Sequence, residues 1–151
     1  MSEQANTVSF RDNNVVVSLE VLHREDPDAV DAHSLNYYVM RVTAEAAGFK
    51  ADFTNSVYLP ELAWLKEKLS EFYLMSEGKV DWIIQEGFLM LTAERSRIGH
   101  ICWTIELTCP SGRESFTQLL LEINNNQTYL PYLIREIEAV LEVFPVVEYG
   151  G

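Results

Sequence analysis

Apolar and polar residues alternate in several stretches of the chain, a pattern typical of β-strands with one buried face. Valine or leucine occupies every second position from 15 to 21, and a similar alternation runs from 101 to 107. The predicted inward-facing residues are Val15, Val17, Leu19 and Val21 in the first stretch and Ile101, Trp103, Ile105 and Leu107 in the second. The predicted turns are Asn13–Asn14, Gly48, Glu86–Gly87 and Ser111–Gly112.

Two later stretches change to helical spacing, and both open with Tyr-Leu-Pro-x-Leu. The corners are Tyr58, Leu59 and Pro60 in the first stretch and Tyr129, Leu130 and Pro131 in the second. Proline is tolerated in a first helical turn, so each motif predicts a joint between a strand and a helix. The apolar stripes are Leu59, Leu62, Leu65, Leu69 and Phe72, and then Leu130, Leu133, Ile134, Ile137, Val140, Leu141 and Phe144.

The two motifs lie 71 residues apart, and the strand patterns before them also correspond. We therefore predict an internal duplication, with pseudo-repeats at about 7–77 and 79–144, within one domain spanning 1–151 that ends in a short frayed C-terminal tail. The predicted fold class is α+β: duplicated ββββα units forming an antiparallel sheet with two helices packed on one face. One continuous sheet is preferred over two stacked layers.

The chain is strongly acidic, with 11 Lys and Arg against 23 Asp and Glu, a net charge of -12 and a pI near 4.5. This charge disfavours nucleic acid as a partner and is compatible with a basic protein partner or with solubility alone. The N-terminus lacks a signal-peptide pattern, and no apolar run reaches the ~20 residues that span a bilayer. We expect a cytoplasmic protein that does not enter a membrane.

The sequence contains no pattern that predicts a catalytic site, a metal site or a cofactor. It has three histidines and two cysteines, in none of the usual metal-binding spacings, and neither a nucleophile elbow nor a glycine-rich phosphate loop. Cys102 and Cys109 should point to opposite faces of one strand. Glutamates on the predicted helices are interpreted as their solvated sides: Glu61, Glu67 and Glu71 with Lys66 and Lys68, then Glu136, Glu138 and Glu142. We expect a binding protein, not an enzyme.

One segment interrupts the duplication. The first half carries "REDPDAVDAHS" at residues 24–34, where the second half has only "RIGH". This acidic insertion contains Glu25, Asp26, Asp28 and Asp31, and its spacing does not match a calcium-binding loop. Such a loop is often only solvated, but an insertion on a duplicated scaffold is also a natural place for a specific function. These four carboxylates are the predicted partner-binding residues, and an exposed Tyr or Trp would serve as an anchor.

The final third, "HICWTIELTCPSGRESFTQLLLEINNNQTYLPYLIREIEAVLEVFP", resembles the C-terminal region of WapI-type bacterial immunity proteins and related uncharacterised bacterial proteins. The similarity lies in the strand-turn-strand, the Q-T-Y-L-P corner at 127–131 and the closing helix that ends in Phe-Pro. It implies a small cytoplasmic protein that binds and neutralises a cognate contact-dependent toxin, and it transfers no catalytic residues. The alternative is a module that binds a small molecule or a peptide.

Overall fold

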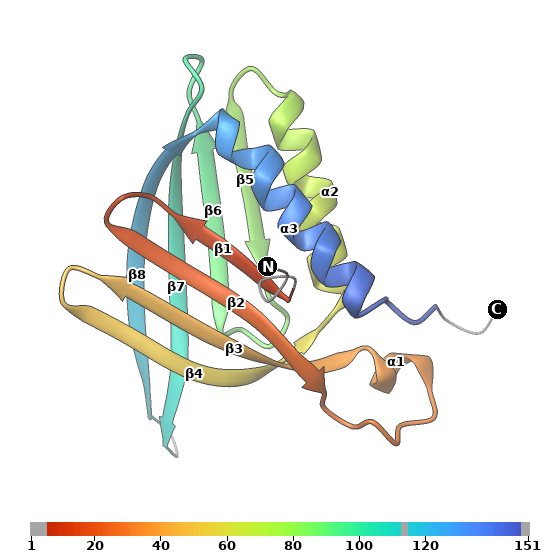
Figure 1. The fold of residues 1–151 in the computed structure, drawn as a ribbon. Coiled ribbons are helices and arrows are strands. Elements are labelled where there is room, and N and C mark those ends of the chain that lie inside the picture. The colour runs from red at the N-terminus through yellow and green to blue at the C-terminus, as the bar shows by residue number, and fades with distance from the viewer. Residues whose placement is uncertain (1–5, 113–114, 149–151) are drawn as a thin grey trace.

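The computed structural model describes residues 6–112 and 115–148, and it has the predicted order of four strands and a helix, twice (Figure 1). The α+β class and the duplicated ββββα arrangement are therefore confirmed. The elements are β1 (Thr7–Arg11), β2 (Val15–Arg24), α1 (Ala32–Leu35), β3 (Tyr37–Ala46), β4 (Phe49–Tyr58), α2 (Pro60–Leu74), β5 (Gly78–Ile83), β6 (Leu89–Arg95), β7 (His100–Gly112), β8 (Ser115–Asn126), η1 (Gln127–Tyr129) and α3 (Leu130–Val143).

The strands form two separate antiparallel sheets, in the orders β1-β2-β3-β4 and β5-β6-β7-β8. The preference for one continuous sheet is therefore wrong. The physical reason lies at the junction between the halves, because β4 leads directly into α2 and α2 then lies along β5. The Lys68 ammonium of α2 donates to the Asp81 carbonyl of β5 at 2.7 Å. A helix thus lies beside the strand that would have joined the first sheet.

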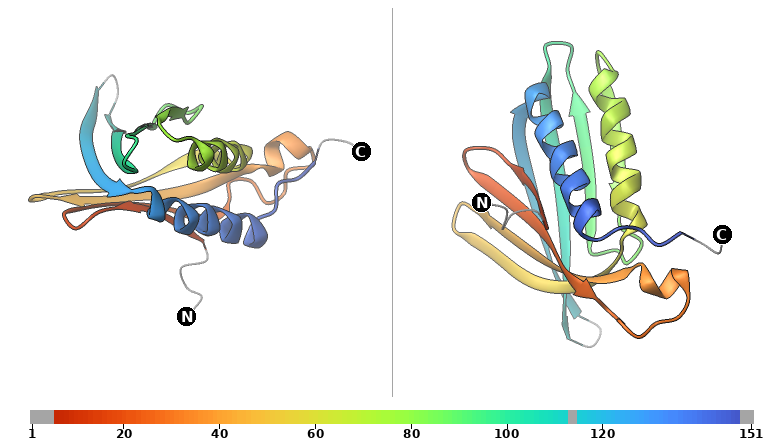
Figure 2. Two further views of the ribbon diagram at one scale, coloured as in Figure 1. Left: turned by 90° about the horizontal axis from the view of Figure 1, so that it is seen from above. Right: turned by 45° about the vertical axis from the view of Figure 1, so that its right-hand side comes forward.

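Each long helix packs against the first strand of the other half. Helix α3 lies against β1 and α2 lies against β5, and the two helices run side by side (Figures 1 and 2). The Ser9 N–H of β1 donates to Glu136 Oε1 of α3 at 2.9 Å, and the Tyr129 hydroxyl donates to the Ser9 carbonyl. Lys66 and Glu138 form an ion pair of 3.4 Å between the helices. The helix that ends each half therefore covers the first strand of the other half.

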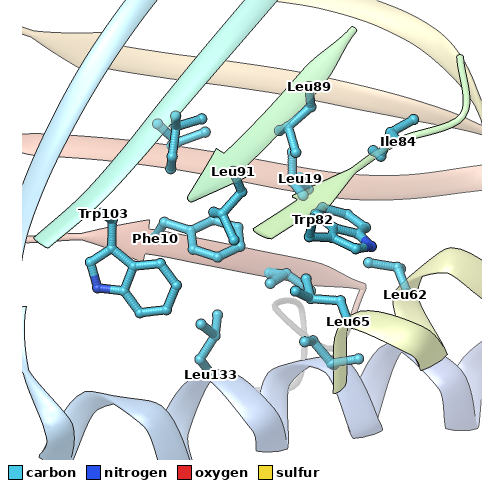
Figure 3. Close-up of a cluster of buried hydrophobic side chains, with 14 of the residues drawn as sticks. Phe10, Leu19, Leu62, Leu65, Trp82, Ile84, Leu89, Leu91, Trp103 and Leu133 are labelled. Carbon is cyan, nitrogen blue, oxygen red and sulfur yellow. The ribbon is translucent and has the colours of Figure 1, made fainter. Parts of the chain in front are cut away.

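One continuous core joins the two sheets and both helices. Figure 3 shows side chains from both halves converging, including Phe10, Leu19, Leu65 and Trp103. The predicted inward-facing strand residues are buried except Val15, which is half-buried. The first helical stripe is buried throughout. In the second, Leu130, Leu133, Ile137 and Val140 are buried, and Ile134, Leu141 and Phe144 are partly buried.

Both Tyr-Leu-Pro corners are the joints that the sequence predicts. Pro60 and Pro131 lie in the first turns of α2 and α3, where no intrahelical N–H is lost. Tyr58 ends β4 and is buried, and Tyr129 is half-buried against β1. The interpretation of Glu136 as solvated is wrong, because its carboxylate accepts the Ser9 N–H. Burial raises the pKa of Glu136.

The segment after α3 is attached to the first half through a buried asparagine. Asn36 is fully buried, and its amide group donates to the Val147 carbonyl at 2.9 Å and accepts the Val147 N–H at 2.7 Å. The expected frayed end, Tyr149 to Gly151, lies outside the described residues. Across residues 6–112 and 115–148, no helix is long and apolar enough to cross a membrane.

Ile137→Ala should lower the free energy of unfolding by about 2–5 kcal/mol, because the truncation leaves a cavity between α3 and the core. Denaturant unfolding measures this. Val143→Ala, at a half-exposed position of the same helix, is the control and should stay within about 0.5 kcal/mol. Equal effects of the two changes would place the buried face of α3 elsewhere.

Candidate functional site: an acidic insertion on an aromatic corner

The acidic insertion is an ordered segment that contains a short helix, whereas the sequence was interpreted as a loop. The Asp26 carboxylate accepts the Asp28 N–H at 3.1 Å in a tight turn. The Asp31 carboxylate caps α1 by accepting the Ser34 N–H at 3.0 Å, and this bond lowers the pKa of Asp31. Glu25, Asp26, Asp28 and Asp31 are all exposed, as a surface for a partner requires.

The ends of the insertion are fixed to the sheet by hydrogen bonds. Arg24 Nε donates to the Leu35 carbonyl at 3.1 Å, which closes the base of the segment. The Glu25 N–H donates to the Tyr37 carbonyl at 2.9 Å and continues the ladder between β2 and β3. Asn36 accepts the Leu59 N–H on its main-chain carbonyl at 2.8 Å, which ties the end of α1 to the first Tyr-Leu-Pro corner. The four carboxylates are therefore held on a rigid base.

An aromatic cluster lies where the insertion meets that corner. We call His33, Tyr37, Tyr58 and Trp64 the aromatic corner. The ring centroid of His33 lies 5.3 Å from that of Tyr37 and 5.1 Å from that of Tyr58, and Tyr58 lies 6.2 Å from Trp64. Trp64 is 49% exposed, so the cluster reaches the surface beside the carboxylates. The Ser56 hydroxyl donates to Glu25 Oε2 at 2.6 Å and holds that carboxylate near β4.

Two further carboxylates lie beneath this surface. Glu61 is only 4% exposed, and its Oε1 accepts the Gln85 N–H at 2.7 Å while its Oε2 is buried without a hydrogen bond. Burial, together with the nearby charge of Glu86, raises the pKa of Glu61 to about 7. Burial also raises the pKa of Glu86, whose carboxylate accepts the Tyr58 N–H. The negative charge of nearby Glu25 raises this pKa further.

The interpretation of Glu61 as part of a solvated helix face is wrong. Glu67 and Glu71 are exposed as predicted, but Glu61 belongs to the buried side of α2. The sequence indicated this burial, because Glu61 precedes Leu65 by four residues and so lies on the same face of the helix. The aromatic corner had no such signal, since His33 and Trp64 are brought together only by the tertiary packing of the insertion.

Metal-binding geometry is not found among the described residues: no three His, Cys, Asp or Glu side chains there are grouped to hold an ion. Cys102 and Cys109 are both half-buried on β7, seven residues apart and so on opposite faces. Burial raises the pKa of the Cys102 thiol, which keeps it in its less reactive protonated form.

Comparison with known proteins gives one family. Residues 9–145 match the model of the Immunity protein WapI-like family. A search of curated proteins gave no match. Among solved structures, a chain from the Trypanosoma bruciei MRP1/MRP2 crystal structures is similar at 11% sequence identity and a TM-score of 0.47, covering 91% of this chain and 83% of that one.

Glu61→Gln should make the stability of the protein less dependent on pH. The pKa of folded Glu61, about 7, lies above that of an unfolded glutamate, so the stability due to its bound proton is lost as the pH rises through about 7. Glutamine keeps the acceptor for Gln85 and does not ionise. The variant should exceed the parent by roughly 1–3 kcal/mol at pH 8 and match it near pH 4.

Denaturant unfolding across this pH range measures the difference. Glu67→Gln, on the exposed side of α2, is the matched control and should follow the parent at every pH. A Glu61→Gln profile parallel to that of the parent would show that Glu61 ionises normally in the folded protein.

Proposed function

The chain belongs to the Immunity protein WapI-like family, and we propose that it neutralises a cognate toxin domain by covering the toxin's active surface with the acidic insertion and the aromatic corner. The observation that supports this proposal is that four exposed carboxylates lie on a segment hydrogen-bonded at both ends, and that His33 of this segment contacts Tyr58, which in turn contacts the half-exposed Trp64. In this proposal the protein acts in the cytoplasm, without a cofactor, a membrane or a nucleic acid, and it works by binding rather than by catalysis.

The charge of the insertion favours a basic partner. Residues 25–35 contain four carboxylates and neither Lys nor Arg. Glu61 and the partly buried Glu86 lie near the same corner, but burial raises the pKa of both and favours their neutral forms, so the negative charge here comes mainly from the four exposed carboxylates. Clustered charge of one sign speeds the encounter with a partner of the opposite sign and orients it. A toxin that binds a polyanionic substrate offers such a basic surface.

Trp64 contributes the binding affinity that the exposed charges do not provide. Exposed carboxylates at an interface rim mainly affect the association rate, whereas partly buried aromatic residues contribute most of the affinity. Trp64 is supported from below by Tyr58, whose ring is itself packed against Tyr37 at 5.1 Å. Such support keeps the indole in place before binding, which reduces the entropy lost in the complex.

The outer face of the first sheet is less suited to this role, because its charges are partly neutralised within the sheet. Arg41 donates to both oxygens of Asp52, at 2.9 and 2.7 Å, and Lys50 lies 3.6 Å from Glu45. Arg24, at the start of the insertion, donates to the Leu35 carbonyl and forms no ion pair with the four carboxylates among the described residues. The acidic insertion is therefore the better candidate for attracting a basic toxin.

Neutralising the insertion should slow association with the cognate toxin domain. The variant combines Glu25→Gln, Asp26→Asn, Asp28→Asn and Asp31→Asn, which keep the hydrogen-bond acceptors of the turn and of the α1 cap. We expect the association rate to fall about tenfold at 50 mM salt. The loss should shrink at 1 M salt, where the Debye length is about 3 Å. Stopped-flow mixing gives the rates.

The matched control removes the same charge from the outer face of the second sheet. Its four changes are Asp81→Asn, Glu94→Gln, Glu106→Gln and Glu122→Gln. We expect this variant to associate nearly as fast as the parent. Equal slowing in both variants would mean that net charge alone steers the toxin, and unchanged association of the insertion variant would remove the insertion from the interface.

Trp64→Ala should instead speed dissociation of the complex. Loss of a central aromatic anchor costs about 2 kcal/mol or more, which corresponds to a roughly 30-fold faster dissociation with little change in association. Surface-immobilised toxin gives both rates, and thermal melting checks that the variant is folded. Tyr73→Ala, another half-exposed aromatic of α2 at its opposite end, is the control. A Trp64→Ala complex as long-lived as that of the parent would exclude Trp64 as the anchor.

A further inference from the structure

A groove of about 620 Å³ lies at the end of the molecule away from the insertion. It opens between the β1–β2 turn and α3, whereas the insertion follows the other end of β2, about 30 Å away along ten strand residues. Figure 1 shows the β1–β2 turn and the beginning of α3 on this side of the molecule. The groove is lined chiefly by Arg11, Asp12, Asn13, Tyr132, Arg135 and Glu136.

The two carboxylates in this groove are already used within the protein. Asp12 accepts the N–H groups of Asn14 at 2.7 Å, Val15 at 2.9 Å and Asn124 at 2.9 Å. Partial burial opposes the ionised form, but these three bonds prevail and lower the pKa of Asp12. Glu136 accepts the Ser9 N–H, and burial raises its pKa. Arg11 lies close enough to Glu136 for its charge to oppose that rise, but no ion pair joins the two side chains.

The two guanidinium groups, unlike the two carboxylates, are not held by hydrogen bonds to the described main chain. Among the described residues, neither Arg11 nor Arg135 forms an ion pair, and both side chains are exposed. Arg135 lies 4.9 Å from the ring centroid of Tyr132, which is 62% exposed and presents a flat apolar surface. In a chain with a net charge of -12, this groove therefore combines an aromatic wall with two exposed guanidinium groups that form no ion pair within the described part of the chain.

The duplication provides a comparison within the same molecule. The offset of 71 residues places Tyr132 opposite Glu61, in the first turns of α3 and α2. In the other half, Glu61 fills the corresponding space and accepts the Gln85 N–H of the β5–β6 turn. In this half a tyrosine takes that position and the groove stays open. The groove is thus a structural difference between the two duplicated halves.

We propose that this groove binds a carboxylate ligand between Arg11 and Arg135, with the flat part of the ligand against Tyr132. A planar guanidinium matches the two oxygens of a carboxylate and donates two parallel hydrogen bonds. The carboxylate belongs either to a small organic acid or to an acidic side chain of another protein, and the ligand chemistry is the same in both cases. This inference does not depend on toxin binding.

The test is a titration of the whole ¹⁵N-labelled chain, followed by NMR at constant ionic strength. The probes are sodium benzoate, sodium acetate as a mimic of an acidic side chain, and neutral benzamide. We expect saturable shifts of the Asn13 and Tyr132 amides with benzoate. The combined variant Arg11→Gln and Arg135→Gln should bind at least tenfold more weakly, whereas Arg41→Gln combined with Arg97→Gln, which removes the same charge elsewhere, should bind like the parent.

The outcomes separate the sources of the carboxylate. Tighter binding of benzoate than of acetate supports an organic acid with a flat body, and equal binding supports an acidic side chain. The proposal is overturned if no anion gives saturable shifts, if benzamide binds as well as benzoate, or if both double variants lose binding equally. The spectra of the variants show at the same time whether they are folded.

Discussion

The open edge of β1 determines how the two halves of the protein are assembled. An edge strand presents unpaired N–H and C=O groups, and a protein must cover them or risk pairing with another chain. Here Glu136 and Tyr129 of the second half bond to the main chain of Ser9, and Asn125 donates to the Arg11 carbonyl at 3.1 Å. The corresponding strand β5 is covered by α2 of the first half. Because each half completes the other's sheet, neither half is a complete folding unit, although the sequence reads as two repeats.

This exchange also determines where binding surfaces can form. The first corner must be rigid, since it sends α2 across to β5, and the insertion uses that rigidity by bonding Asn36 to Leu59. Its carboxylates are therefore presented by a fixed base rather than by a flexible loop. At the other end of β2, the turn that faces α3 lies at a groove that contains Arg11 and Arg135. The length of one strand thus separates the two proposed sites, and neither would obstruct the other.

Much of this fold follows from local patterns, and the parts that do not are those set by contacts between the halves. Alternation identified the inward faces of β2 and β7, and Tyr-Leu-Pro with its apolar stripe identified both helices, because period and proline position are local properties. Whether two sheets join or separate depends on which strand each helix covers, and no local pattern records that. The same limit applies at the site. The acidic residues were visible as an insertion, but Glu61 is buried and Glu136 is partly buried through partners in the other half. The aromatic corner and the Arg11–Arg135 groove likewise depend on tertiary packing.

The crossed helices have a consequence for the order in which the chain is made. A ribosome releases β1 to β4 and α2 first, yet the strand that α2 covers, β5, comes after it, and the helix that covers β1 comes last. Domains usually fold as units during synthesis. Here β1 keeps an open edge until α3 has emerged, and α2 keeps an uncovered apolar stripe until β5 has followed it. The fold is therefore completed only after α3 has been made, and a prematurely terminated chain that lacks α3 leaves the edge of β1 exposed to aggregation and proteolysis.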